Sequence, residues 1–259
     1  MRCQAYAGHF IYWIVLFFYG IVRAMSQPKL FRIIDKAMFD YNLIENGDNI
    51  LVGVSGGKDS TSLVHYFSQR RIQKREDFSF TAVHIHTDIS PPLSEELVSL
   101  FKSWNVDLRI LRISVLERLK EGKKMNCWWC STQRRTELNS YAIENGFNKI
   151  ALGHHLDDML ETLVMNVLSK GELSTMPPYL SYEKYPVTVI RPLILCDEKT
   201  IISHAVEHQF KSATCTCTYQ DNSARKDARK KIADLTQGKY DVKMKIVKAL
   251  QNIKSEYLP

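Results

Sequence analysis

Two short segments of the chain place residues suited to phosphate chemistry at turns that follow apolar runs. The first is SGGKDS, residues 55–60, which separates an apolar run from a helix-like segment. Adjacent glycines let main-chain N–H groups approach an anion closely, and a helix N-terminus favours negative charge. The segment is not a Walker A loop, because Asp59 follows Lys58 where that motif has Ser or Thr. A carboxylate beside a phosphate indicates a divalent cation or a bound leaving group, so the segment predicts a nucleoside triphosphate with Mg²⁺ and cleavage that releases pyrophosphate.

The second segment is KIALGHHLDDMLETL, residues 149–163. Gly153 and His154 end an apolar run, and Asp157 and Asp158 open the helix-like segment after it. Acidic residues are common at helix starts because they complement the helix dipole, so either one alone is weak evidence. Ligands of parallel sheets bind beyond the carboxyl ends of the strands, where both segments are expected. Asp158, together with Asp59, is therefore predicted to handle magnesium or pyrophosphate or to transfer a proton.

The six cysteines are too few for a disulfide scaffold and are unevenly placed. Cys127 and Cys130 form a CxxC just before a helix-like segment, which suits a redox pair, a metal or an iron–sulfur cluster. Cys215 and Cys217 favour the metal interpretation, because they could supply further ligands. Three thiolates would leave one iron of a cluster open for chemistry, whereas four favour structural zinc. Cys196 is expected to be a core or spectator thiol.

Alternating apolar runs and helical patterns predict the elements that position these residues. Strands are expected at residues 49–54, 80–86, 108–113, 149–153 and 187–190, and helices at 29–44, 60–69, 94–104, 132–145 and 157–168. Strands that alternate with helices indicate βαβ units, so we expect an α/β fold with a doubly wound, mainly parallel sheet. The chain after about residue 223 predicts two basic helices.

Composition indicates a globular protein with an anionic partner. The chain has 259 residues, is 45% hydrophobic and carries a formal net charge of +7. A basic balance favours nucleic acid moderately. Basic residues cluster at the start of the C-terminal segment more densely than solubility requires, and this cluster could bind a phosphate backbone. Its members are Arg225, Lys226, Arg229, Lys230 and Lys231.

The N-terminal segment carries an apolar run at residues 10–22 that is shorter than the roughly 20 residues a membrane-spanning helix needs. We expect Met25 to be the natural start, with a membrane anchor as the alternative. The expected organisation is therefore an N-terminal extension (1–24), an ATP-binding catalytic domain that includes the cysteine site (25–222) and a basic helical tail (223–259).

SGGKDS after the first predicted strand resembles the PP-loop ATP pyrophosphatase superfamily. The ordered set SGGKDS, CWWCSTQRR, KIALGHHLDD, MPPYL, VIRPL and the late cysteines is similar to one branch, the cytosolic tRNA 2-thiocytidine synthetases, over most of the chain. The resemblance implies that ATP adenylates the C2 oxygen of a cytidine in the tRNA anticodon loop, and that sulfur replaces this oxygen with loss of AMP and pyrophosphate. It also implies a four-iron four-sulfur cluster held by three cysteines, a sulfur donor such as a cysteine desulfurase, a cytoplasmic location and the option of a homodimer.

Site residues follow from the resemblance position by position. Catalytic roles are expected for Lys58, Asp59 and Asp158. The remaining ATP-binding residues are expected to be Ser55, Gly56, Gly57, Ser60, His84, Gly153 and His154, with His86 as the alternative to His84. The tRNA-binding residues are expected to be Arg134, Arg135, Arg225, Lys226, Arg229 and Lys230.

The cluster ligands are expected to be Cys127, Cys130 and Cys215. The family's usual tail is a proline followed by CxxC, whereas this chain has Ala213-Thr214-Cys215-Thr216-Cys217. Cys217 is therefore the alternative third ligand.

Two other functions fit parts of the pattern. A tRNA 2-thiouridine synthetase of the same superfamily normally has zinc-binding CxxC pairs near both ends, and this chain has only Cys3 near its start. A catalytically idle RNA-binding iron–sulfur protein would retain the cysteines and the basic tail. The intact SGGKDS and GHHLDD segments favour an active enzyme over an idle one.

Overall fold

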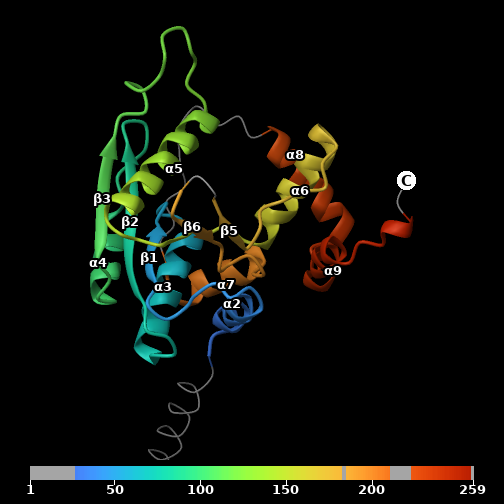
Figure 1. Cartoon of the computed structure of the whole chain (residues 1–259), viewed down its shortest axis with the longest axis horizontal. Helices are drawn as coiled ribbons and strands as arrows, with labels where there is room; N and C mark the ends of the chain where they lie inside the picture. The colour runs from blue at the N-terminus through green and yellow to red at the C-terminus, as the bar shows by residue number, and fades with distance from the viewer. Residues whose placement is uncertain (1–26, 183–184, 211–222, 258–259) are drawn as a thin grey trace, which may run out of the picture.

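The computed structural model describes residues 27–182, 185–210 and 223–257 (Figure 1). Its centre is a six-stranded sheet with the order β3-β2-β1-β4-β6-β5. The strands are β1 (Asn49–Gly53), β2 (Ser79–Thr87), β3 (Leu108–Ile113), β4 (Lys149–Ala151), β5 (Tyr179–Ser181) and β6 (Thr188–Ile190). Every neighbouring pair is parallel except β5 with β6. The predicted α/β fold with a doubly wound, mainly parallel sheet is therefore confirmed.

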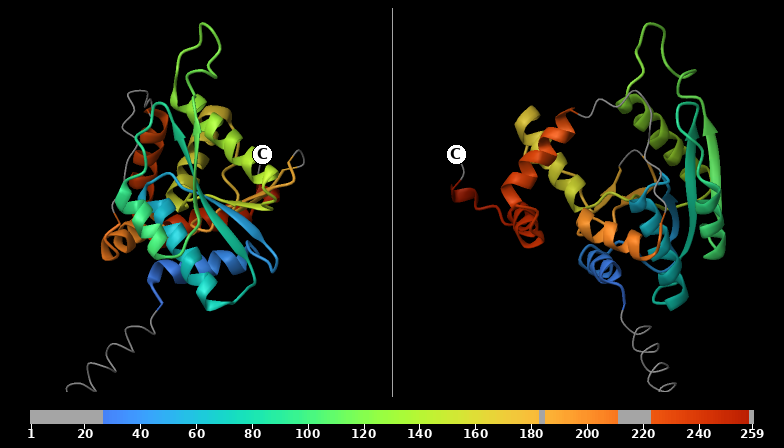
Figure 2. Two further views of the ribbon diagram at one scale, coloured as in Figure 1. Left: turned by 90° about the vertical axis from the view of Figure 1, so that its left-hand side faces the viewer. Right: turned by 180° about the vertical axis from the view of Figure 1, so that it is seen from behind.

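The helices follow the strands in the alternation expected of βαβ units. They are α2 (Lys29–Asp40), α3 (Lys58–Gln73), α4 (Glu95–Ser103), α5 (Cys127–Glu144), α6 (Leu156–Lys170), α7 (Glu198–Glu207), α8 (Ser223–Thr236) and α9 (Tyr240–Gln251), with a short 3₁₀ turn, η1, at Ser255–Tyr257. Buried residues of α2, α3, α4 and α7 form one core with the sheet, and α5 packs against a second core that contains Leu51, Val83 and Ile150. Figures 1 and 2 show α6, α8 and α9 gathered to one side of the sheet.

The strand order reverses between β1 and β4. The chain runs outward from β1 through β2 to β3, and then returns to place β4 on the other side of β1. The loops after β1 and β4 therefore start from neighbouring parallel strands and leave in different directions, which is where open α/β sheets form a binding crevice. SGGKDS is the first of these loops and GHH, residues 153–155, is the second.

The observed helix boundaries differ from the predicted ones where a capping side chain or a residue with left-handed backbone conformation determines the helix end. Helix α5 begins at Cys127 rather than Thr132, because the Asn126 side chain accepts a hydrogen bond from the Trp129 N–H at 2.8 Å and caps it there. Helix α2 ends at Asp40, before Asn42 adopts a φ of 47°. Sequence reasoning missed α7 and the three-residue edge strand β5.

Several expectations fall on residues that the structure leaves undescribed. They concern the N-terminal extension at residues 1–24, the third cluster ligand at Cys215 or Cys217, and the domain boundary at residue 222. These remain predictions. Within the described ranges, no helix is both long and apolar enough to cross a membrane.

An ion pair buried at the amino ends of β1 and β4 fixes the two strands side by side. Asp48 accepts a hydrogen bond from Lys149 Nζ at 2.7 Å, and both side chains are almost fully buried. Asp48 also accepts from Asn148 Nδ2 and from the Glu45 N–H, each at 2.7 Å. The carboxylate thus joins the turn before β1 to the start of β4, at the opposite end of the strands from the loops of interest.

Replacement of this carboxylate should destabilise the whole fold. Asp48→Asn leaves the Lys149 ammonium buried without its counter-charge, so we expect the free energy of unfolding in urea to fall by about 3–5 kcal/mol. The double variant D48N/K149M removes both charges and should recover much of the loss. If D48N and the double variant were equally unstable, the unpaired ammonium would not be the cause.

Candidate active site

The loop after β1 is pinned by its own hydroxyl groups. Gly56 has a φ of 87°, which other residues rarely adopt, and Gly57 is the N-cap of α3 without a side-chain cap. Ser60 Oγ donates to the Gly57 carbonyl at 3.0 Å and accepts from the Ser55 N–H at 3.2 Å. Because no cap side chain covers the start of α3, its main-chain N–H groups can bind an anion.

The loop after β4 packs directly on the first turn of α3. A Cβ atom at Gly153 would lie 3.2 Å from the Ser60 nitrogen and 3.3 Å from the Asp59 carbonyl carbon. Both neighbours are backbone atoms, which cannot turn aside as a flexible side chain could. A side chain at residue 153 would therefore force this backbone to shift by a few tenths of an ångström. The structure brings the two predicted loops together at one edge of the sheet.

A carboxylate that sequence reasoning missed contacts the loop lysine. Lys58 Nζ lies 3.2 Å from Asp59 Oδ1 and 3.1 Å from Oε1 of Glu198, the first residue of α7. Burial alone would lower the pKa of Lys58, but the two carboxylates outweigh it and raise this pKa. The ammonium group therefore keeps its charge at neutral pH. The sequence signal that could have predicted the start of α7 is the segment DEK, residues 197–199, in which the N-cap Asp197 precedes Glu198.

The two aspartates at the start of α6 have different surroundings. Asp157 accepts from Lys243 Nζ of α9 at 2.5 Å and from the Glu198 N–H at 2.7 Å, so it joins three helices. Burial would raise the pKa of Asp157, but these two hydrogen bonds outweigh it and lower the pKa. Asp158 accepts from the His155 N–H at 3.2 Å in a capping box, and Arg225 Nη1 of α8 lies 3.5 Å away. Both oxygens of each aspartate therefore have contacts: those of Asp157 with α7 and α9, and those of Asp158 with the N-cap of α6 and with Arg225.

The arginines of α8 contact carboxylates of α6. Glu161 is almost fully buried, and its Oε1 lies 2.6 Å from Arg229 Nε. Its Oε2 lies 3.5 Å from Arg225 Nε. The predicted tRNA-binding residues of α8 therefore divide into two groups, since Arg225 and Arg229 dock the helix on α6 while Lys226 and Lys230 are exposed.

Two histidines beside the loops are kept neutral by burial. His84 Nδ1 lies 2.8 Å from the Val54 carbonyl, just before the glycine loop. Burial lowers the pKa of His84 and outweighs the hydrogen bond to Val54, which would raise it. Burial lowers the pKa of His154 to about 4, against the opposing influence of Asp158. Within the described part of the chain, His84 Nε2 and His154 Nδ1 are buried without a hydrogen-bond partner.

Cys127 and Cys130 lie one turn apart at the start of α5. Their spacing puts both thiols on the same side of the helix. Trp129, between them, donates its indole N–H to the Val115 carbonyl at 3.0 Å, and Cys130 packs against the apolar core under α5. The start of α5 is thereby joined to the segment that follows β3. Cys196 lies in the main core and is fully buried, as expected for a core thiol, and burial raises its pKa.

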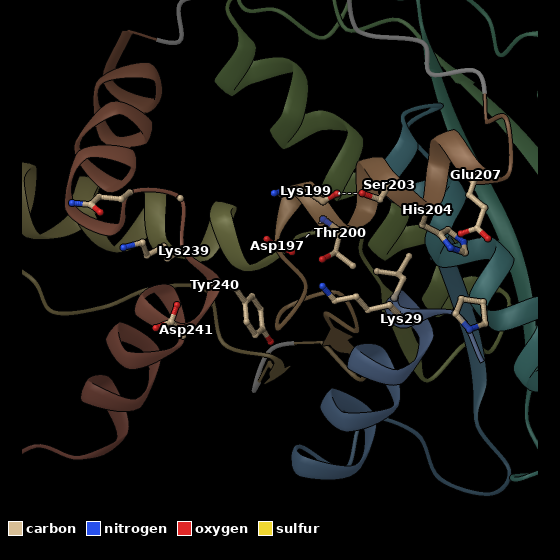
Figure 3. A pocket seen from close by; sticks show the side chains of 14 residues that line it. Lys29, Asp197, Lys199, Thr200, Ser203, His204, Glu207, Lys239, Tyr240 and Asp241 are labelled. Carbon is tan, nitrogen blue, oxygen red and sulfur yellow. Dashed lines mark hydrogen bonds between the residues drawn. The ribbon is translucent and has the colours of Figure 1, made fainter. Parts of the chain in front are cut away.

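A cavity of about 550 Å³ lies elsewhere, between α2, α7 and the turn from α8 to α9 (Figure 3). Lys29, Thr200, His204, Glu207 and Tyr240 are among its lining residues. None of the predicted site residues lines it. The candidate active site is therefore the sheet edge where the two loops meet, not this cavity.

Comparison with known proteins gives the same family for nearly the whole chain. The profile of the PP-loop domain family matches residues 27–235. The tRNA-cytidine(32) 2-sulfurtransferase of Coxiella burnetii (strain CbuG_Q212) is 36% identical over 240 residues, which cover 90% of this chain and 92% of that protein. The tRNA-cytidine(32) 2-sulfurtransferase of Legionella pneumophila (strain Paris) is 38% identical over 237 residues, covering 90% of this chain and 83% of the relative.

A solved structure has the same fold. The U34-tRNA thiolase NcsA from Methanococcus maripaludis, determined with its 4Fe-4S cluster, aligns with a TM-score of 0.70 and 21% identity. The alignment covers 87% of this chain and 80% of that one.

The lowered pKa of Asp157 predicts a pH-dependent contribution to stability. A carboxylate whose folded pKa lies below its unfolded value stabilises the fold above the unfolded pKa, near 3.9, and the effect is lost as the pH falls through the folded pKa. We therefore expect Asp157→Asn to lower the free energy of unfolding by about 1–3 kcal/mol at pH 7 and by progressively less below about pH 4. Denaturant titrations across this range measure the difference. The control is D227N, at an exposed aspartate of α8, which should change little; an Asp157→Asn effect independent of pH would contradict the account.

Proposed function

The chain belongs to the PP-loop domain family, and on that premise we propose that it is an ATP-dependent tRNA sulfurtransferase that 2-thiolates a cytidine of the anticodon loop. The observation that carries the proposal is the contact of SGGKDS with Gly153 at the sheet edge, beside a helix that begins with Cys127 and Cys130. The sulfurtransferase relatives align over most of their own length, which supports the same reaction class.

The loop after β1 is proposed to hold the triphosphate of ATP. The N–H groups at the start of α3 bind phosphate oxygens, and Lys58 neutralises the charge that develops on the leaving pyrophosphate. Asp59 and Asp158 offer the carboxylate oxygens that Mg²⁺ prefers. His84, whose Nδ1 contacts the strand end before the loop, is proposed to lie beside the adenine.

The proposed reaction exchanges one oxygen for one sulfur in two steps. The C2 oxygen of the base attacks the α-phosphorus of ATP, and the bond to pyrophosphate breaks. Sulfur at the sulfide level then adds at C2 as the nucleophile, and the bond from C2 to the adenylated oxygen breaks, so that the electron pair leaves with AMP and no net oxidation or reduction occurs. Adenylation is needed because an amide-like carbonyl oxygen is a poor leaving group until it is part of a phosphate ester. His154, in the loop that precedes α6, is proposed to contribute to ATP binding.

The cysteines at the start of α5 fit a four-iron four-sulfur cluster. Two thiols on one side of a helix, with one of them against an apolar core, form a soft donor set that suits iron. Cys127, Cys130 and either Cys215 or Cys217 would hold the cluster. With only three protein ligands, one iron would keep an open coordination position, at which the bound cluster would supply sulfur. Helix α5 fixes the two cysteines at its start, and Arg134 and Arg135 follow them one turn later on the same helix.

The tRNA is proposed to contact two helices. Arg134 and Arg135 follow the cysteines on α5, and Lys226 and Lys230 are exposed on α8. Arg225 and Arg229 are proposed to act mainly by holding α8 on α6, so that the lysines face outward. A cytoplasmic location, a cysteine desulfurase as sulfur donor and a homodimer belong to the same proposal.

The thionucleosides of bulk tRNA test this function. We expect 2-thiocytidine to disappear in cells that lack the gene and to return with the wild-type gene, as measured by mass spectrometry of digested tRNA. Complementation with K58A or C127S should fail, because these variants lack the phosphate-binding ammonium and a cluster thiolate. C196A removes a thiol that is buried in the main core, and it should restore the modification.

Two results would contradict the proposal in different ways. Loss of a 2-thiouridine species with normal 2-thiocytidine would assign the chain to the uridine branch, which the U34-tRNA thiolase neighbour represents. No change in any thionucleoside would favour the idle RNA-binding protein.

A further inference from the structure

Three histidines converge between α3 and α7, inside the first core and away from the loops described above. They are His65 of α3, His204 of α7 and His208 at the C-cap of α7. Their imidazole nitrogens, one from each ring, all lie within 4.8 Å of one another. His65 and His204 are buried, whereas His208 is exposed. The predicted mechanism uses none of these residues.

We propose that His65, His204 and His208 form a site for a divalent transition metal ion, zinc in the first instance, which clamps α3 to α7. The proposal rests on the geometry of the three rings and is independent of the tRNA substrate.

The spacing on α7 is suited to metal binding. His204 and His208 lie four residues apart in HAVEH, so their side chains project from the same face of the helix. Two histidines with this helical spacing are a recurrent pair of zinc ligands. Their ring centroids are 4.4 Å apart, which shows that the exposed ring of His208 lies against its buried neighbour rather than extending into solvent.

His65 supplies the third nitrogen from the neighbouring helix. His65 Nδ1 lies 3.1 Å from His204 Nε2. Two ligands that each lie about 2.0–2.1 Å from a tetrahedral zinc ion are separated by roughly 3.3 Å, so this pair is already near the required distance. Three imidazoles and one water molecule form a known type of zinc coordination.

The surroundings hold the rings in place and leave them neutral. The aromatic rings of Phe31, Trp104 and Phe210 contact the buried histidines from other sides. Burial is the main cause that lowers the pKa of His65 to about 4 and that of His204 to about 3, and neutral imidazole is the form that binds metal. His204 also lines the cavity in Figure 3, together with Glu207.

A metal ion at this position would brace the active site from below. Helix α3 begins with Lys58 and α7 begins with Glu198, and these two side chains contact each other at 3.1 Å. His65 and His204 each lie about two turns further along the same two helices. A bond through the ion would add a second fixed point between the same two helices. Zinc should therefore raise the melting temperature of the protein.

Zinc binding by the full-length protein with its iron–sulfur cluster tests the proposal. We expect wild-type protein to bind zinc in equilibrium dialysis, and zinc-edge X-ray absorption to show nitrogen ligands at about 2.0–2.1 Å without sulfur at about 2.3 Å. His208→Ala should weaken zinc binding by at least about tenfold, because even the loss of a residue that only hydrogen-bonds to a metal ligand can have an effect of this size. The variant should also lose the zinc-dependent rise in melting temperature. His208 is exposed, so this variant should fold normally.

The matched control is V206A, an exposed position on the same helix, which should bind zinc as the wild type does. Equal zinc binding by wild type and H208A would overturn the proposal, as would a zinc spectrum dominated by sulfur or the absence of zinc binding by the wild type.

Discussion

The close contact between the loop after β4 and the first turn of α3 is the constraint on which the candidate site depends. A Cβ atom at Gly153 would lie only 3.2–3.3 Å from the backbone of Asp59 and Ser60. The contact exists because β1 and β4 are adjacent parallel strands whose following segments leave in different directions. It places the phosphate-type loop and the loop that carries His154 at one edge of the sheet. The start of α5, which carries Cys127 and Cys130, is joined to the segment that follows β3.

A series of ion pairs and hydrogen bonds links the loop after β1 to the C-terminal helices. Lys243 of α9 binds Asp157, Asp157 accepts the Glu198 N–H, and the Glu198 side chain contacts Lys58. Arg225 and Arg229 make a parallel connection from α8 to α6. The basic C-terminal segment is therefore part of the support of the site, as well as a surface that can meet an anionic partner. This double use explains why some of its cations face carboxylates while others face solvent.

Sequence reasoning located the elements well where hydrophobic periodicity was strong. The four long βα alternations and the two basic helices were predicted, and the motif order identified the family. The missed α7 begins with Glu198, and the role of Glu198 depends on a lysine that lies 140 residues earlier in the chain. Long-range pairs of this kind leave no local pattern. The docking role of Arg225 and Arg229 was missed for the same reason, because a cluster of cations does not reveal which members have a buried carboxylate such as Glu161 nearby.

The most direct test of the central claim follows the oxygen atom that leaves the base. Purified enzyme would be supplied with ATP, a sulfur source and tRNA that carries oxygen-18 at C2 of its anticodon-loop cytidine. If the loop after β1 presents the α-phosphate to that oxygen, the AMP formed must contain one oxygen-18 atom for each thiolated base. Unlabelled AMP, or ADP as the nucleotide product, would contradict adenylation of the base.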